Sequence, residues 1–296
     1  MFAGVEAGGT KFNCIVARQP DEVAAQIQFP TTTPTETISK VIEFFRPFRD
    51  KGRLAALGVG SFGPCDLVVG SPTYGYITST PKPGWQNADI LGPIQSALSI
   101  PAAFDTDVNA AALGESRWGA TRGTDTSLYL TVGTGIGGGL IVDGEPLHGL
   151  RHPEMGHIRI PHDRSSDPFP GSCPFHGDCF EGLASGPAIQ ARFGVRGEQL
   201  ADDDPFWELE SDYIAAAVAT YILVTSPQRI VLGGGIMQRT QLLPQIRKKV
   251  VLLIGGYVRD PAVTDEIDAY IVAPGLGRLS GVLGAVALAA STGSIE

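Results

Sequence analysis

The sequence predicts an α/β fold made of two domains. Strand-like segments alternate along the chain with helical patterns, and this alternation is typical of α/β proteins. The length of 296 residues corresponds to about two domains, and a hydrophobic content of 43% is enough to bury a sizeable core. A strand, a glycine turn and a second strand also occur twice, because placing Gly8 over Gly133 aligns two such segments at an offset of 125 residues. This repetition suggests two related halves.

The first half is expected to begin with two strands around a glycine turn. Thr33, Pro34 and Glu36 then form a capping box with proline at the first helical position. Apolar residues at helical spacing follow, so we expect a helix that ends before Pro47. The segment Ser71–Trp85 is rich in Pro, Gly, Thr and Tyr, which predicts a long ordered loop. The strands expected in this half are Phe2–Val5, Phe12–Val16, Leu54–Gly60 and Ala102–Phe104, and an Ala-rich helix should follow Asn109.

The second half is expected to repeat the opening and then to carry a long irregular segment, Gly149–Glu181. The elements expected here are strands over Leu128–Val132, Gly139–Val142 and Arg229–Leu232, a helix over Trp207–Val224, and a tightly packed final helix in the small-residue stretch Gly281–Ala290. We place the domain boundary near residue 115. This gives domains over 1–115 and 116–280, with a last helix over about 281–294 packing on the first domain.

The charge balance and the absence of targeting signals exclude several classes of protein. The chain has 22 Lys and Arg against 31 Asp and Glu, a net charge of −9 that repels nucleic-acid phosphates. The N-terminus lacks the pattern of a signal peptide, and no apolar run approaches the roughly 18 residues of a membrane span. We therefore expect a soluble cytoplasmic protein that binds neither nucleic acid nor membrane.

Three glycine clusters follow predicted strands and are candidates for phosphate binding. They are Gly8–Lys11, Gly133–Gly137 and Gly233–Gly235, and glycine lets backbone N–H groups converge on an anion. Any one cluster could be an ordinary hairpin turn, but three at strand ends favour a nucleotide site. Gly133–Gly138 and Gly58–Gly63 match G-x-G-x-x-G, but neither precedes a helix, and no Walker A motif occurs. Rossmann and P-loop sites are therefore not expected.

A cluster of cysteine and histidine residues predicts a structural metal site. Cys173, His176 and Cys179 form a C-x2-H-x2-C run, and His157 lies sixteen residues upstream. Two thiolates and two imidazoles suit a tetrahedral, closed zinc site. His152 and His162 are alternate ligands, and free thiols with surface histidines are the simpler alternative. Cys14 lies on a predicted strand and is expected to be a core residue.

Taken together, these motifs resemble the bacterial ROK-family sugar kinases. The resemblance is carried in order by Glu6–Lys11, Asp105–Asn109, Leu130–Gly137, Glu154–His157, Cys173–Glu181 and Gly233–Gly235. It covers nearly the whole chain, and Ser71–Trp85 and His148–His157 look more specifically like ROK fructokinases. The resemblance implies the two-domain actin/hexokinase/Hsp70-like (ribonuclease H-like) fold, with a cleft between the domains. Zinc would then shape the loop that carries Glu154 and Glu181.

The resemblance also implies a site for ATP with Mg²⁺. The residues matching the phosphate-binding hairpins are Gly8, Gly9, Thr10, Lys11, Thr131, Gly133, Thr134 and Gly135. Those matching the adenosine-contacting segments are Pro187, Gly233, Gly234 and Gly235. Glu6 stands where many relatives have Asp, and Arg278 stands where relatives often have Asp or Asn.

Asp107 is the candidate catalytic base, because its position matches the base of ROK kinases and a carboxylate suits proton transfer from a sugar hydroxyl. The alternative is that Asp107 caps the following helix, although Asn109 could also do so. Asp105 would orient either the loop or the sugar. Glu154, His157 and Glu181 resemble the family's sugar contacts.

The sequence therefore predicts an ATP-dependent fructokinase acting on the 6-hydroxyl of D-fructose. A glucokinase or mannokinase of the same family is the nearest alternative, and a non-catalytic, zinc-stabilised sugar-binding protein is the alternative from another class. ROK-like repressors carry a helix-turn-helix domain before the first hairpin, and here that hairpin begins at Gly8. A homodimer is expected because the family is often dimeric.

Overall fold

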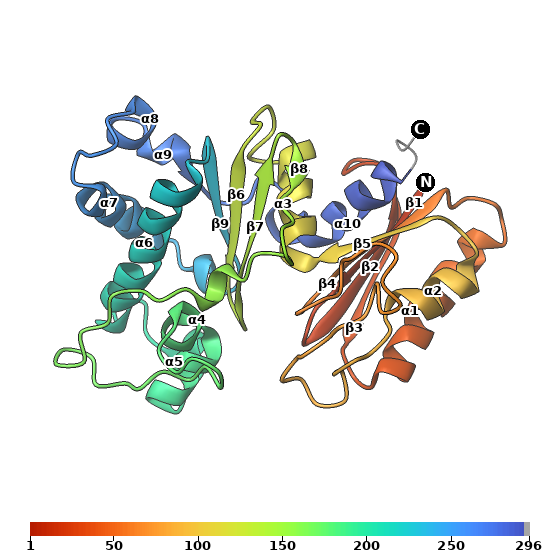
Figure 1. The fold of residues 1–296 in the computed structure, drawn as a ribbon, viewed down its shortest axis with the longest axis horizontal. Coiled ribbons are helices and arrows are strands. Elements are labelled where there is room, and N and C mark those ends of the chain that lie inside the picture. The colour runs from red at the N-terminus through yellow and green to blue at the C-terminus, as the bar shows by residue number, and fades with distance from the viewer. Residues whose placement is uncertain (293–296) are drawn as a thin grey trace. The chain divides into compact units, whose positions relative to one another are not determined.

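The protein is described by a computed structural model covering residues 1–292, and it contains two five-stranded sheets (Figure 1). The first has the order β3-β2-β1-β4-β5, and the second has the order β10-β9-β6-β7-β8. The strands of the first sheet are β1 (Phe2–Ala7), β2 (Lys11–Ala17), β3 (Val23–Pro30), β4 (Ala56–Ser61) and β5 (Ala102–Thr106). Those of the second are β6 (Ser127–Val132), β7 (Ile136–Val142), β8 (Glu145–Pro146), β9 (Arg229–Gly233) and β10 (Ile271–Val272).

The two sheets share one strand order, which supports the two related halves expected from the sequence. In the first, β1 pairs antiparallel with β2 and parallel with β4, and β4 pairs parallel with β5. In the second, β6 takes the place of β1: it lies beside β7 and pairs parallel with β9, which pairs parallel with β10. The aligned glycines Gly8 and Gly133 each begin the turn between the first two strands of their sheet.

Helices connect these strands in the α/β manner predicted. Around the first sheet they are α1 (Pro34–Arg49), α2 (Leu91–Leu98), α3 (Asp107–Trp118), the 3-10 turn η4 (Gly277–Leu279) and α10 (Ser280–Ser291). The others are η1 (Met155–His157), α4 (Phe180–Ala184), α5 (Gly186–Phe193), η2 (Gly197–Gln199), α6 (Phe206–Thr225), η3 (Ile236–Gln238), α7 (Leu242–Ile254), α8 (Pro261–Thr264) and α9 (Ile267–Tyr270). Among residues 1–292, no helix combines the length and apolar character of a membrane span.

Helix α1 confirms the predicted start and corrects the predicted end. Thr33 is the N-cap, and its side chain accepts a hydrogen bond from the backbone N–H of Glu36 at 3.4 Å. The helix does not end before Pro47 but continues to Arg49 with the proline inside it. A proline in a helix removes one intrahelical hydrogen bond and crowds the carbonyl four residues earlier, but only Phe48 and Arg49 follow Pro47 in the helix, so the disruption is confined to its last turn. Burial of Phe45 against the sheet holds the last turns in place.

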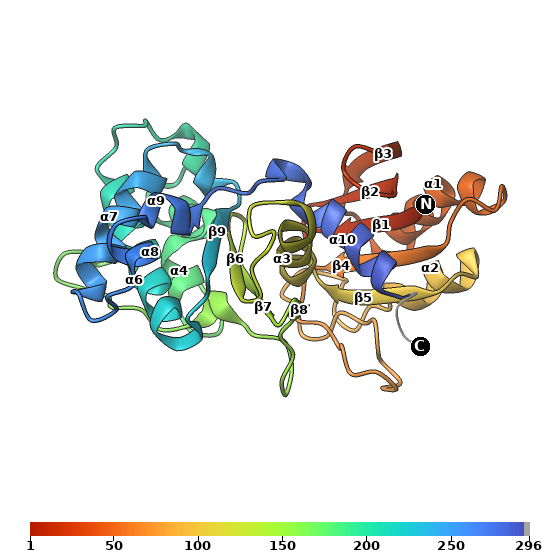
Figure 2. The ribbon, with the colours of Figure 1, turned by 90° about the horizontal axis from the view of Figure 1, so that it is seen from above.

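The first sheet is covered on both faces, and the final helix packs very closely on one of them (Figure 2). Helices α1 and α2 share a core with one face, whereas Val282 and Val286 of α10 pack on Ile15 on the other. A Cβ at Gly58 would lie 1.9 Å from the Ala285 carbonyl oxygen, and one at Gly284 would lie 1.7 Å from that of Ala110. Glycine is therefore required where α10 meets β4 and α3. Residues 293 and 294 of the predicted last helix lie outside the described residues.

The chain divides into two compact units. Unit 1 holds Met1–Gly123, Gly139–Pro153 and the chain from Gly275 onward, and unit 2 holds Thr124–Gly138 and Glu154–Pro274. The chain passes from one unit to the other four times, and one of these passages lies within β7. The predicted split into domains 1–115 and 116–280 stays a prediction, while α10 belongs to unit 1.

Candidate active site and metal centre

Asp107, the predicted catalytic base, is the first residue of α3, and it is not the helix cap. The N-cap is Thr106, whose hydroxyl accepts the Asn109 backbone N–H at 3.1 Å. The Asp107 carboxylate accepts the N–H of its neighbour Val108 at 2.9 Å. Burial raises the pKa of the Asp107 carboxyl to about 6, and the Val108 hydrogen bond offsets part of that shift. The carboxylate is therefore a stronger base than an ordinary Asp, yet it is ionised at neutral pH.

Asp105 organises the loop that leads into α3. It is buried, and its Oδ1 accepts the Thr106 backbone N–H at 2.7 Å and the Asn109 side-chain amide at 2.8 Å. Its Oδ2 lies 2.9 Å from Nε2 of His148, whose pKa is raised by this hydrogen bond. The three partners account for the loop-orienting role considered for Asp105. His148 lies 43 residues beyond Asp105 in the chain, so no local sequence pattern connects the two residues.

A second carboxylate, Glu6, lies at the end of β1 and interacts electrostatically with Asp107. Burial raises the pKa of Glu6 to about 7, the hydrogen bond from Asn13 lowers it, and the charge of Asp107 raises it again. The side chain packs against the start of α10, where a Cβ at Gly281 would lie 2.4 Å from Glu6 Oε1. Arg278, in the turn before that helix, is exposed.

The first glycine hairpin is held by backbone contacts and by the start of the segment after β3. Gly8 N–H donates to the Lys11 carbonyl at 3.0 Å, which closes the turn. Thr31 donates its N–H to the Thr10 carbonyl at 2.9 Å and its hydroxyl to the Gly8 carbonyl at 2.7 Å. A Cβ at Gly8 would lie 2.7 Å from the Lys11 carbonyl oxygen, while Gly9 faces open space. The turn therefore leaves no room for a side chain at Gly8 but does leave room for one at Gly9.

The second hairpin gathers the other predicted nucleotide segments within unit 2. Gly133 donates its N–H to the Gly135 carbonyl at 3.0 Å and accepts the N–H of Gly186, next to Pro187, at 2.7 Å. Thr131 pairs with Gly233 across β6 and β9. A Cβ at Gly133 would lie 3.3 Å from the Gly235 backbone nitrogen.

Gly234 explains why this junction needs glycine. Its φ is +97°, and a Cβ there would lie 2.3 Å from the Val132 carbonyl oxygen. The structure therefore brings together Thr131, Gly133–Gly135, Pro187 and Gly233–Gly235, which were predicted from separate parts of the sequence. Thr134 lies in the turn itself.

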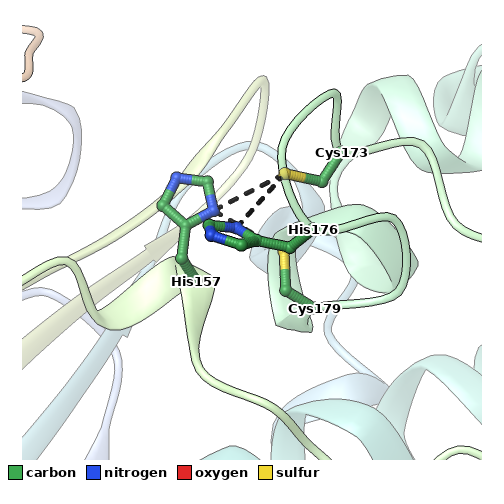
Figure 3. A group of neighbouring side chains, drawn as sticks. All are labelled: His157, Cys173, His176 and Cys179. Atoms are coloured by element: carbon green, nitrogen blue, oxygen red, sulfur yellow. Dashed lines mark hydrogen bonds between the residues drawn. The ribbon is translucent and has the colours of Figure 1, made fainter.

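The four predicted metal ligands also meet in unit 2 (Figure 3). His157 comes from η1, whereas Cys173, His176 and Cys179 come from one loop, and all four donor atoms lie within 4.8 Å of one another. His157 Nδ1 lies 3.8 Å from Cys173 Sγ and 3.6 Å from Cys179 Sγ, and His176 Nδ1 lies 3.6 Å from Cys173 Sγ. Ligands of a tetrahedral zinc ion are about 3.6 Å apart when its bonds to sulfur and nitrogen are about 2.3 and 2.05 Å. The donor set therefore fits such a cation.

The two alternate histidines lie outside this group and have other partners. His152 Nε2 accepts the Cys65 backbone N–H at 3.1 Å. His162 Nδ1 lies 3.3 Å from a carboxylate oxygen of Asp178, a residue inside the metal loop. Asp178 also accepts hydrogen bonds from Arg159 at 2.5 Å and Arg164 at 2.7 Å, and the hydrogen bonds from Arg164 and His162 lower the pKa of Asp178. Through these contacts Asp178 anchors the loop that carries Cys173, His176 and Cys179, a role that sequence spacing does not reveal. Cys14 is buried in β2, as predicted.

The candidate zinc ligands His157, Cys173, His176 and Cys179 form the metal group. Along the chain, the predicted sugar-contacting carboxylates of unit 2 lie on either side of it. Glu154 directly precedes η1 and is exposed, and its carbonyl accepts the His157 N–H at 3.0 Å. Glu181 lies in the first turn of α4, two residues after Cys179. One of its oxygens is 3.9 Å from His157 Nε2, and the other accepts the Ile136 N–H at 2.9 Å. Asp105 and Asp107 belong to unit 1.

Comparison with known proteins identifies the family. The ROK family model matches residues 2–292. A relative from Bacillus subtilis (strain 168) is 50% identical over 98% of this chain and 95% of its own length. A fructokinase from Lactococcus lactis subsp. cremoris is 45% identical over 92% of this chain and 91% of its own length.

Among solved structures, the ROK hexokinase from Thermus thermophilus superposes with a TM-score of 0.80 at 27% identity, and the match covers 100% of this chain and 99% of that one. This likeness confirms the predicted actin/hexokinase-like fold class. Because the family model spans nearly the whole described chain, and close relatives match over most of their length, the chain belongs to the ROK family.

Proposed function

We propose that this protein is an ATP-dependent fructokinase that phosphorylates the 6-hydroxyl of D-fructose. The observation that carries the proposal is the 45% identity with a fructokinase over more than nine-tenths of both chains. The geometry adds support, because Asp107 is released from helix capping by Thr106 and can serve as a base. The two glycine hairpins add a second line of support, since they occupy corresponding places in two sheets of the same strand order and turns of this kind can bind phosphate through backbone N–H groups.

Asp107 would take the proton from the sugar 6-hydroxyl as its oxygen attacks the γ-phosphorus. The bond between that phosphorus and the bridging oxygen breaks, ADP leaves with the electron pair, and Asp107 holds the proton until release. Asp105 keeps the loop before α3 in place through its bonds to Thr106 and Asn109. Glu154, His157 and Glu181 are the proposed hydroxyl contacts, and the acceptor oxygens of the two carboxylates would select a polyol.

Two cations complete the proposal. Mg²⁺ arriving with ATP would neutralise charge on the phosphates, with the Glu6 carboxylate as its proposed protein partner through water. Zinc would be held by His157, Cys173, His176 and Cys179, where it would have a structural role. Purified protein should contain close to one zinc per chain by elemental analysis. A folded protein lacking metal, with unchanged melting, would contradict the zinc site.

Steady-state kinetics with ATP and a panel of hexoses tests the function. Fructose should give the highest kcat/KM, and the product should carry phosphate on the 6-oxygen by NMR. Faster turnover of glucose or mannose would make the protein a glucokinase or mannokinase, and absence of ATP turnover with intact sugar binding would favour a non-catalytic sugar-binding protein. We also propose a homodimer, which light scattering of the purified protein would test.

A further inference from the structure

Glu181 joins two parts of unit 2, the metal group and the second glycine hairpin. Its Oε2 accepts the backbone N–H of Ile136, the residue directly after the hairpin turn, at 2.9 Å. The same oxygen lies against Gly135, where a Cβ would approach it to 3.0 Å. Any side chain at position 135 would press on this carboxylate. The hydrogen bond crosses 45 residues of sequence and fixes the end of the turn to helix α4.

The other oxygen of Glu181 faces the metal group. Oε1 lies 3.9 Å from Nε2 of His157, while Nδ1 of the same ring points at the two cysteine sulfurs. When Nδ1 is a metal ligand, Nε2 must carry the ring proton, and a carboxylate is one of the usual acceptors of such an N–H. At 3.9 Å the Glu181 oxygen is within ion-pair range of Nε2 but beyond the distance of a direct hydrogen bond. Cys179 is the N-cap residue of α4, so a second ligand is built into the helix turn that carries Glu181.

We propose that Glu181 is a positioning residue, whose carboxylate fixes the second phosphate hairpin to the metal-binding His157, so that nucleotide affinity depends on the metal group. This inference rests on the proposed kinase function and assigns Glu181 a role beyond sugar contact. A sugar contact acts on fructose alone. A link from the Glu181 carboxylate to Ile136 affects the hairpin, and with it nucleotide affinity, whether or not sugar is present. Measuring nucleotide affinity without sugar therefore separates the positioning role from the sugar-contacting role.

Nucleotide binding without fructose is the first test. Affinity for the non-hydrolysable analogue AMP-PNP with Mg²⁺ is measured by calorimetry for the wild type, Glu181→Ala and Glu154→Gln. Loss of a hydrogen bond to a charged group predicts that Glu181→Ala weakens AMP-PNP binding by about ten-fold. The matched control Glu154→Gln alters the other proposed sugar-contacting glutamate and should leave AMP-PNP affinity unchanged. Equal AMP-PNP affinity for Glu181→Ala and the wild type would overturn the proposal.

Hydrogen exchange at the Ile136 amide is the second test, and it does not depend on activity. Glu181→Ala should speed exchange at Ile136 by about ten-fold or more, whereas Glu181→Gln should retain most protection because its amide oxygen can still accept that N–H. Chelation of the metal from the wild type should also speed exchange at Ile136. Unchanged exchange after chelation would remove the metal from the proposal, and unchanged exchange in Glu181→Ala would overturn it.

The two measurements also separate this proposal from the proposed function. If the protein is not a kinase, the wild type will fail to bind AMP-PNP while the exchange effect of Glu181→Ala remains. If the kinase proposal holds and the link is wrong, the wild type will bind AMP-PNP and Glu181→Ala will bind it equally well. Melting curves of each variant exclude global unfolding as the cause, and Glu181→Gln provides the test if Glu181→Ala does not fold.

Discussion

The two glycine hairpins occupy the same place in sheets of the same strand order, yet they are held in different ways. Each is closed by a backbone hydrogen bond of its own, from Gly8 to Lys11 and from Gly133 to Gly135, and the first is further held by Thr31, 23 residues from Gly8. The second is fixed by Gly186 and by the carboxylate of Glu181, which is adjacent to the metal group. One topology therefore accepts either a local hydrogen-bonded support or a support assembled from a distant loop.

The largest effect is expected in unit 1 at Asp107. Asp107→Asn removes the proton acceptor, and general-base catalysis is worth about 10²–10⁴-fold, so kcat should fall by at least about a hundred-fold. AMP-PNP affinity should barely change, because both hairpins are intact. In the wild type, kcat should decline as the pH falls through about 6, where the Asp107 carboxyl becomes protonated. Near-normal turnover in the variant would exclude Asp107 as the base.

The same substitution should stabilise the fold at high pH. The folded-state pKa of Asp107 is raised, so the stability contributed by its protonated form is complete below about pH 4 and is lost as the pH rises through about 6. Asn resembles the protonated acid and does not ionise. Thermal melting at pH 8 should therefore give a higher Tm for Asp107→Asn than for the wild type, and the difference should vanish near pH 4. A lower Tm at pH 8 would show that the carboxylate has a structural role.

The next largest effect is expected at Glu154, which extends the comparison to unit 2. Glu154→Gln should lower kcat/KM for fructose by about ten- to a hundred-fold, since a hydrogen bond to a charged group contributes roughly 1.5–3 kcal/mol. KM for ATP should stay constant. The measurement is steady-state kinetics with each substrate varied in turn. A rise in KM for ATP without a change in KM for fructose would show that Glu154 contributes to nucleotide binding and not to sugar binding.

Loss of the metal group should affect the second hairpin and leave the first unchanged. Cys179→Ser should lower zinc content and Tm, because the binding free energy of a closed structural site is also folding free energy. Hydrogen exchange should quicken at Ile136 and remain constant at Gly8, whose turn contacts lie in unit 1. Equal exchange changes at both hairpins would show that the two supports are not independent.

The smallest effect is expected at Thr31. Thr31→Val keeps the shape of the side chain and removes the hydroxyl that donates to the Gly8 carbonyl at 2.7 Å. A single neutral hydrogen bond contributes about 1 kcal/mol, so AMP-PNP affinity should weaken by about five-fold. Thr31→Ser, which keeps the hydroxyl, is the matched control. The loss of AMP-PNP affinity in Thr31→Val should be the same before and after chelation of the metal. A loss that changes on chelation would show that the supports of the two hairpins are coupled.

The elements that can be predicted from this sequence are those whose signal is local. Periodicity and turn residues predict the α6 helix, the start of α1 at Thr33 and every strand except β3, β8 and β10, because capping and burial patterns act over a few residues. The predicted end of α1 before Pro47 is wrong, because the tertiary packing of Phe45 outweighs the local tendency of proline to end a helix. The ligand set of the metal group is also predictable, since three of its four donors lie in one heptapeptide.

The sequence by itself determined the α/β class, the repeated hairpin, the glycines at strand ends and the cysteine–histidine group. Tertiary structure alone decided that His148 bonds Asp105, that Asp178 anchors the metal loop, and that Glu181 reaches Ile136. These contacts join residues 14 to 45 positions apart. Such contacts leave no periodic or spacing signal, because their geometry exists only after the loops have packed on the sheets and helices.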